Sequence, residues 1–375
     1  MAKRSVKAAI ARGVKSTLGD EFKGALRDTG SGSMPRVIPS GSLSIDVATG
    51  IGGIPEGRFV VSHGDEAGGK TTQGLHLCAE VQKIGGVAVF LDFERKLDLV
   101  YARAIGVNTD ELCVVHPKYI EQGFTIMERT CAVVREQSKD APLVFVWDSL
   151  QGAVARRTSE QEWEDEGYPP EARAYSRGMA KFNPTLSDSR AILFGISQVR
   201  VAVGGHGPGQ GKRKIGVGKS AGFYASMIFL FRSSKPRGKV GKSSAREGED
   251  REGNDVEILL AKNQVGRPFT VARVPILFGQ GFDPGGDTLN AALAVGVAHS
   301  TKKGWYEVAL DEETVFAIQG VSGMRKLAES RPDDFEKVRR NIRERIGKVS
   351  VETLEKHEAE SFVGDDEEPE EGEDE

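Results

Sequence analysis

Apolar residues in the middle of the chain form short continuous runs, each closed by a polar residue. These runs cover residues 87–92, 143–148 and 191–198, which end in Asp92, Asp148 and Gln198. Segments with helical periodicity lie between them, over 99–105, 124–135 and 172–186, and a shorter strand is expected over 112–115. Runs of this kind are typical of buried parallel strands. The alternation predicts an α/β fold with a central, mostly parallel, twisted sheet and right-handed crossovers.

The pattern changes at both ends of the chain. Residues 7–27 repeat apolar positions every three to four residues, which predicts an amphipathic helix with a cationic polar face. A Gly/Ser linker over 29–33 separates this helix from the rest, so its apolar stripe must pack on its own core or on a neighbouring subunit. From Asp283 onward helices and a small β element around 304–308 predict a second, smaller domain.

A glycine-rich turn stands between a β-rich run and a helical pattern. Gly64, Gly69, Lys70 and Thr71 fit the spacing G-x-x-x-x-G-K-[ST]. Such a turn points backbone N–H groups at an anion, and the following helix adds its positive end. Lys70 would reach the β- and γ-phosphates, and the Thr71 hydroxyl would bind Mg²⁺. The predicted nucleotide-binding loop comprises Gly64, Asp65, Glu66, Ala67, Gly68, Gly69, Lys70, Thr71 and Thr72.

Polar residues at the predicted strand ends are candidates for the chemistry. Carboxyl ends of parallel strands meet at one edge of a sheet. Asp148 is expected to hold Mg²⁺ through water or through Thr71, and Glu94 to activate water against the γ-phosphate. An ordinary surface glutamate is the alternative for Glu94. Gln198 would either contact the γ-phosphate or simply cap its strand.

Residues 199–222 hold eight glycines, five basic residues and no acid. The basic residues are Arg200, Lys212, Arg213, Lys214 and Lys219. A loop of this length and composition does not fold alone, and its cations suit a phosphodiester chain that would order it. It lacks aromatic residues, so contacts to the backbone of a nucleic acid are expected; a solvated linker is the alternative. The acidic stretch 159–170 is expected to be a mobile surface loop.

Overall composition favours a cytoplasmic protein without a membrane span. The three cysteines, Cys78, Cys113 and Cys131, are far apart, as in reduced proteins, and Cys78 is expected in the core. There is no run of 18 apolar residues and the basic start lacks a signal-peptide stretch. The net charge is −4, but residues 365–375 hold nine acids, so the rest of the chain carries +5. Such a tail either competes with nucleic-acid phosphates or only aids solubility.

Taken in order, the motifs resemble those of the bacterial RecA recombinase family, and the chain is identified as a divergent or phage-encoded member. The matching segments are Pro39 to Asp46, Gly52 to Arg58, Gly69 to Thr72, Leu91 to Glu94, Tyr101 to Val107, Asp148-Ser149, Ser197 to Arg200, Phe223 to Ser226 and Lys262-Asn263. The resemblance covers about 7–346. It implies a RecA-type P-loop ATPase core with an N-terminal helical oligomerisation segment and a small α+β C-terminal domain.

The resemblance also implies individual roles. Glu94 would be the catalytic base, with Lys70 and Gln198 acting on the γ-phosphate, and Tyr101 would stack on adenine. Lys262 would reach the ATP of the neighbouring subunit. The acidic stretch 159–172, with Arg173 facing DNA, and the loop 199–222 would be the two DNA-binding loops. The N-terminal helix would dock on the neighbour, which favours that alternative over packing on its own core.

Three positions depart from the family pattern. Two strands are expected over Phe223 to Arg232 and Asp255 to Ala261, joined by a hairpin over Ser233 to Gly253. Gln264 replaces a second family lysine after the second of these strands, Gly222 stands where a lysine precedes Phe223, and Ser197 replaces an asparagine. One cation that acts between subunits is therefore missing.

The implied domains are 1–33 for subunit docking, 34–282 for the ATPase core, 283–350 for the small domain and 351–375 for a disordered acidic tail. The implied function is a DNA-dependent ATPase that forms helical filaments on single-stranded DNA and exchanges it with homologous duplex. ATP and Mg²⁺ are the expected cofactors, and single-strand-binding protein and loading mediators are expected further partners. The alternatives are a hexameric helicase-type motor and a DNA-binding recombination mediator with weak ATPase activity. Closed rings of six or an absent ATPase would distinguish them.

Overall fold

The computed structural model describes residues 35–160, 170–200, 214–215, 222–238, 251–311 and 314–347. The expected N-terminal helix, the acidic tail and most of the cationic loop lie outside these ranges, as do residues 161–169 of the acidic stretch. From Val37 onward the described residues belong to one compact unit.

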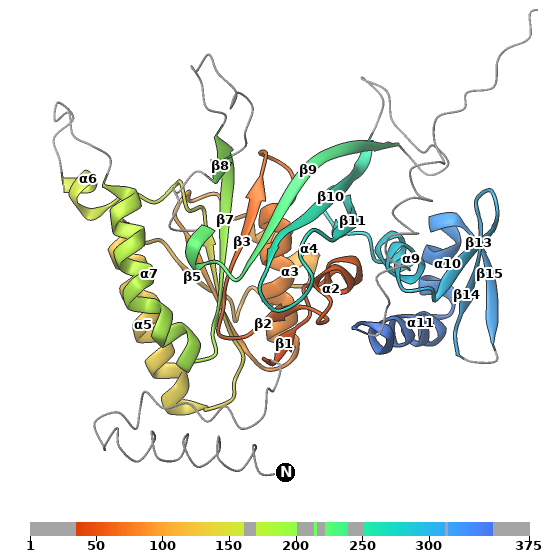
Figure 1. Ribbon diagram of the computed structural model, residues 1–375, viewed down its shortest axis with the longest axis horizontal. Helices are drawn as coiled ribbons and strands as arrows, with labels where there is room; N and C mark the ends of the chain where they lie inside the picture. The colour runs from red at the N-terminus through yellow and green to blue at the C-terminus, as the bar shows by residue number, and fades with distance from the viewer. Residues whose placement is uncertain are drawn as a thin grey trace, which may run out of the picture. The chain divides into compact units, whose positions relative to one another are not determined.

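A large mixed sheet forms the centre of this unit (Figure 1). In spatial order its strands are β12 (Gly281–Phe282), β11 (Val271–Leu277), β10 (Arg251–Asn263), β9 (Met227–Gly238), β3 (Phe59–Gly64), β7 (Ile192–Arg200), β6 (Leu143–Asp148), β4 (Val87–Asp92) and β5 (Cys113–Val115). The strands from β9 to β5 run parallel, whereas β10, β11 and β12 extend the other edge antiparallel. The expected α/β fold is confirmed, and the parallel strands are those that carry the predicted polar ends.

Helices cover both faces of the sheet because its inner strands are apolar on both sides. On one face lie α2 (Leu43–Thr49), α3 (Lys70–Lys83) and α4 (Leu99–Ile105), and on the other α5 (Ile120–Gln137) and α7 (Glu171–Asp188). Alternate residues of β6 enter the two cores: Val144 and Val146 face α3, while Phe145 and Trp147 face α5 and α7. A Cβ on Gly178 of α7 would lie 2.1 Å from Phe124, so this glycine lets the two helices approach closely.

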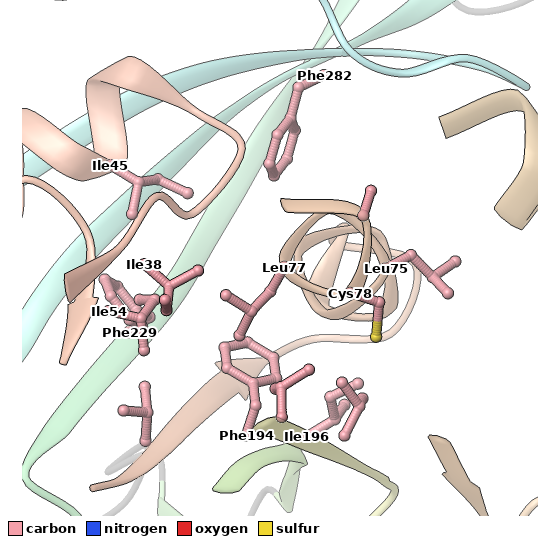
Figure 2. Packing of buried hydrophobic residues seen from close by; sticks show 14 of the residues in the cluster. Ile38, Ile45, Ile54, Leu75, Leu77, Cys78, Phe194, Ile196, Phe229 and Phe282 are labelled. Atoms are coloured by element: carbon pink, nitrogen blue, oxygen red, sulfur yellow. The ribbon is translucent and has the colours of Figure 1, made fainter. Parts of the chain in front are cut away.

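The core beneath α3 fixes the helix that follows the glycine-rich turn. Leu77 of α3 lies against Phe194 and Ile196 of β7, and all three are at most 2% exposed (Figure 2). Cys78 is fully buried in the same cluster, which confirms its expected place in the core. A buried leucine typically contributes about 2–5 kcal/mol relative to alanine, so this packing holds the start of α3 firmly at the sheet.

The C-terminal part of the unit has a core of its own. It contains α9 (Pro284–Ala294), α10 (Gly320–Ser330), α11 (Pro332–Arg345) and a three-stranded antiparallel sheet of β13 (Ala298–Lys302), β14 (Trp305–Ala309) and β15 (Val315–Gln319). Asp283 accepts the N–H of Gly285 at the start of α9 and pairs with Arg325 of α10, 2.8 Å between Oδ2 and a guanidinium nitrogen. Two short strands, β1 (Val37–Ile38) and β2 (Ile54–Pro55), pair antiparallel apart from the large sheet.

Some expected boundaries are wrong. The strand expected from Phe223 begins at Met227, because Lys262 Nζ donates to the carbonyls of Gly222 and Phe223 and holds them in a helical turn, and pairing with β3 starts only at Met227. Residues 156–160, which overlap the expected acidic loop, form α6 (Arg156–Glu160), supported by an i,i+4 pair between its two end residues.

Within the cationic segment, residues 199–200 and 214–215 lie in strands, whereas Gly222 lies in the helical turn before β9. β7 continues to Arg200 and pairs with β8 (Lys214–Ile215). None of the helices in the described ranges is both long and apolar enough to cross a membrane.

Candidate functional site at the sheet rim

The ends of four neighbouring strands meet at one rim of the sheet. Gly64 at the end of β3 is paired with Gln198 of β7, and Asp92 at the end of β4 is paired with Asp148 of β6. Beside this rim lies a cleft of about 570 Å³, bounded by the turn after β3, helix α4 and strands β10 and β11. Its size is that of ordinary small-molecule sites.

The turn after β3 needs its glycines for conformation and for space. Gly69 adopts a left-handed conformation, with φ of 92°, directly before α3. A Cβ there would lie 2.3 Å from Ile276, and a Cβ on Gly64 would lie 2.6 Å from Phe231. The contact at Gly64 is with the β-carbon and carbonyl of Phe231, so β9 leaves no room for a side chain there. At Gly69 the positive φ, rather than the contact with the flexible end of Ile276, requires glycine. This is the geometry of an anion-binding loop at a helix N-terminus.

Lys70 is the first residue of α3, and its side chain folds back over the turn. Its ammonium donates to the carbonyl of Asp65, and the residue is only 6% exposed. Burial lowers the pKa of Lys70, while Asp148 and Asp65 oppose that effect. The carboxylates thus keep a cation inside the turn, where it can neutralise phosphate charge.

Thr71 and Asp148 bring two hard oxygen ligands together. The Thr71 hydroxyl donates to Asp148 Oδ2 at 2.8 Å. Burial raises the pKa of Asp148 to about 6; the Thr71 hydrogen bond acts against this, and the charge of Glu94 adds to it. A hydroxyl and a carboxylate in contact fit the usual environment of Mg²⁺, which takes few protein oxygens and completes its shell with water and phosphate.

Glu94 follows β4 and lies in the same group of side chains. Ser149 Oγ donates to Glu94 Oε1, and Lys96 Nζ lies 3.1 Å from Oε2. Burial acts to raise the pKa of Glu94, but the hydrogen bonds from Ser149 and Lys96 outweigh it and leave the pKa lowered. Asp92 accepts the N–H groups of Lys96 and Leu97, which fixes the turn that presents Glu94. The glutamate is therefore held as a carboxylate beside Asp148.

Tyr101 of α4 closes one side of the cleft. It is half-buried, and its hydroxyl lies 2.8 Å from Thr72 Oγ1 in the first turn of α3. Val100 beside it lines the same cleft and is 75% exposed. The structure thus brings an aromatic ring and an apolar side chain next to the predicted phosphate site, as a flat heterocyclic base requires.

The predicted DNA-binding residues are only partly described. Arg173 is exposed in the first turn of α7, directly after the undescribed residues 161–169. Arg200 and Lys214 are paired backbone positions of β7 and β8. Lys212, Arg213 and Lys219 lie outside the described residues.

Lys262 contacts the last residue of the cationic loop, Gly222. It lies in β10, where burial lowers its pKa and its ammonium donates to the carbonyls of Gly222 and Phe223. In this subunit Lys262 therefore anchors the segment that follows the cationic loop.

Sequence reasoning missed several polar residues of the rim. Lys96, His63 and Gln151 received no role, yet Lys96 pairs with Glu94, and His63 and Gln151 both contact Ser197. Lys96 stands two residues after Glu94, a spacing that would have justified attention. His63 and Gln151 carry no motif that marks them.

Comparisons with known proteins agree with this geometry. The family model described as "RecA N-terminal domain" matches residues 6–283. The chain is 34% identical over 330 residues to "Protein RecA" of Thermotoga sp. (strain RQ2), covering 88% of each protein. The chain belongs to the RecA family. "Protein RecA" of Thermus thermophilus is 36% identical over 325 residues, covering 85% of this chain and 89% of that protein.

Membership of the RecA family confirms the resemblance drawn from the motifs. It makes the chain an ATP-dependent recombinase of recombination and repair, in a family of DNA-dependent ATPases that bind nucleotide with Mg²⁺ and form filaments on DNA. Neither the helicase-type motor nor the mediator is favoured by any of these relatives.

Proposed function

We propose that ATP bound at the rim switches the cationic loop of this chain between states that hold and release single-stranded DNA. One observation carries the proposal: Gly64, which opens the phosphate loop, and Gln198, two residues before the end of β7, are directly paired in adjacent strands. A change at the γ-phosphate therefore acts within one strand spacing of the chain that leads into the cationic loop.

The nucleotide is bound by the loop from Gly64 to Thr72, with Tyr101 against adenine. Mg²⁺ is held by Thr71 and Asp148, whose oxygens already lie 2.8 Å apart. When bound, the ion would supply positive charge that neutralises the phosphates. Lys70 places its ammonium on the same phosphates, and Glu94, kept ionised by Ser149 and Lys96, accepts a proton from the attacking water.

DNA is contacted along its phosphates by cations at the roots and in the body of the two loops. Arg173, Arg200, Lys212, Arg213, Lys214 and Lys219 make up this set. Such contacts are independent of sequence and weaken as salt rises. With Gln198 in contact with the γ-phosphate, ATP orders the second loop, and hydrolysis loosens it.

The assembly is a helical filament of identical subunits in the cytoplasm. Residues 1–33 dock on the neighbour, 34–282 form the core, 283–350 the small domain and 351–375 an acidic tail. Lys262 senses the neighbour's ATP when it leaves the carbonyls of Gly222 and Phe223. Single-strand-binding protein and loading mediators act on this filament, which pairs single-stranded with homologous double-stranded DNA.

Steady-state ATP hydrolysis with and without single-stranded DNA tests the proposal. The rate rises several-fold with DNA in the wild type, and Lys70→Ala abolishes turnover because phosphate charge loses its cation. Lys83→Ala is the matched control, since Lys83 lies in the same helix but pairs with Glu80 at the far end. An unchanged rate on adding DNA, or turnover retained by Lys70→Ala, would contradict the proposal.

A further inference from the structure

The segment 148–152, at the end of β6, connects the nucleotide carboxylates with both DNA-binding segments. Asp148 accepts from Thr71, and Ser149 donates to Glu94. The carbonyl of the next residue, Leu150, accepts from Tyr175 Oη at 2.7 Å, and Tyr175 lies in α7, the helix that follows residues 161–169. The residue after Leu150, Gln151, reaches in the opposite direction, to β7.

The Gln151 side chain holds the backbone of Gln198 through two hydrogen bonds, which together we call the Gln151 clasp. Its Nε2 donates to the carbonyl of Gln198 at 3.0 Å, and its Oε1 accepts the Gln198 N–H at 3.1 Å. The same Nε2 donates to Ser197 Oγ at 2.8 Å. One side-chain amide thus satisfies both backbone groups of a single residue, so Gln198 cannot move along the strand without breaking two hydrogen bonds at once.

A contact between His63 and Ser197 links the Gln151 clasp to the phosphate loop. His63 precedes Gly64 at the end of β3, is 3% exposed, and its Nδ1 lies 3.2 Å from Ser197 Oγ. The ends of β3, β6 and β7 are therefore joined through one serine hydroxyl and one glutamine amide. Because these groups are buried or half-buried, loss of one partner leaves others unsatisfied, which costs more than the bond itself contributes.

We propose that Gln151 is the positioning residue that couples ATP to DNA: it fixes the Gln198 backbone to the segment 148–152. With that backbone fixed, contact between the Gln198 side chain and the γ-phosphate pulls on β7 and the loop beyond it. Without the Gln151 clasp, the same contact moves only Gln198 and does not displace β7 or the loop. The inference rests on the proposed function, since it assumes that Gln198 senses the γ-phosphate.

A second glutamine provides a control of the same chemistry. Gln82, near the end of α3, donates from Nε2 to the Asn108 carbonyl and accepts the Asn108 N–H on Oε1, both at 2.9 Å. It clasps one residue's backbone just as Gln151 does, but at an exposed site away from the rim. A purely structural role predicts similar consequences for the two glutamines, whereas a coupling role predicts consequences for Gln151 alone.

The test measures how much single-stranded DNA tightens binding of a slowly hydrolysed ATP analogue, using full-length wild type, Gln151→Leu and Gln82→Leu. Coupling between two ligands is reciprocal, so this ratio also measures how much ATP tightens DNA binding. Without DNA, Gln151→Leu is expected to bind the analogue with an affinity within about two-fold of the wild-type value. The factor by which DNA tightens this binding is expected to be about ten-fold smaller than in the wild type. Gln82→Leu is expected to keep the full effect.

Each outcome decides between the claims. Full coupling in Gln151→Leu overturns this inference while the proposed function stands. Loss of analogue binding by Gln151→Leu without DNA also overturns it, because the clasp would then only maintain the site. Absence of any DNA effect in the wild type contradicts the proposed function itself.

Discussion

Two carboxylate clusters among the described residues can be compared directly, and of these two the rim cluster adjoins a cleft. The rim cluster consists of Lys70, Thr71, Glu94 and Asp148. The helix joint consists of Ser40, Ser42, Asp46 and Asp287, where α2 meets α9. In both places burial raises the pKa of an aspartate, that of Asp148 to about 6 and that of Asp46 to about 7.

The joint satisfies its carboxylates internally. Asp287 accepts from Ser42 Oγ at 2.7 Å and from the N–H of Leu43 at 2.6 Å, at the start of α2. Asp46 accepts the N–H of Ser40 at 2.8 Å. These carboxylates therefore cap and connect helices, and the bonds hold the small domain's first helix to the core.

The rim cluster differs from the helix joint because cations lie beside its carboxylates and a cleft adjoins it. Lys70 and Lys96 stand beside the carboxylates, and the adjoining cleft is lined by Lys70, Thr71 and Tyr101. A raised aspartate pKa alone would mark both places as functional. Burial alone gives a carboxylate an unusual pKa, whereas a neighbouring cation and an adjoining cleft are what make it chemically useful.

The largest difference between the two places is expected in turnover. Glu94→Gln removes the proposed proton acceptor but keeps an acceptor oxygen for Ser149, so ATP binding is expected to persist and the hydrolysis rate to fall by about 10²–10⁴-fold. Asp46→Asn at the joint leaves hydrolysis near the wild-type rate. Single-turnover hydrolysis with a parallel ATP-binding measurement checks both. Normal turnover by Glu94→Gln would remove this residue as the base.

A smaller difference is expected in the pH dependence of stability. Because the folded state raises the pKa of Asp46 from 3.8 to about 7, the folded state holds a proton that the unfolded state releases. Stability from this group is thus full below about pH 4 and is lost as the pH rises to about 7, with a slope of at most about 1.4 kcal/mol per pH unit.

Asp46→Asn removes this titration while its amide oxygen can still accept the Ser40 N–H. Thermal unfolding between pH 5 and 8 should show that the stability of Asp46→Asn, relative to that of the wild type, increases as the pH rises. Parallel curves for the two proteins would mean that Asp46 carries no such penalty.

Local patterns in the sequence sufficed for much of the fold and part of the site. The spacing of Gly64, Gly69 and Lys70 marks the phosphate loop, and unbroken apolar runs place Asp148 and Gln198 at strand ends, because both signals lie within a few neighbouring residues. The roles assigned to these residues stay predictions.

The contacts between distant segments could not be predicted in this way. Ser42 and Asp287 are 245 positions apart, and Gln151 meets Gln198 across 47. A glutamine after a strand and a serine before a helix have no periodicity that names their partner. The turn at Phe223 was missed for the same reason, since Lys262, 39 positions away, holds it.

The most direct test of the account is the affinity of full-length protein for labelled single-stranded DNA under three conditions: no nucleotide, ADP, and a slowly hydrolysed ATP analogue. We expect tight, cooperative binding only with the analogue, accompanied by assembly of subunits on the strand. Equal affinity in all three conditions, with the protein remaining monomeric, would contradict it.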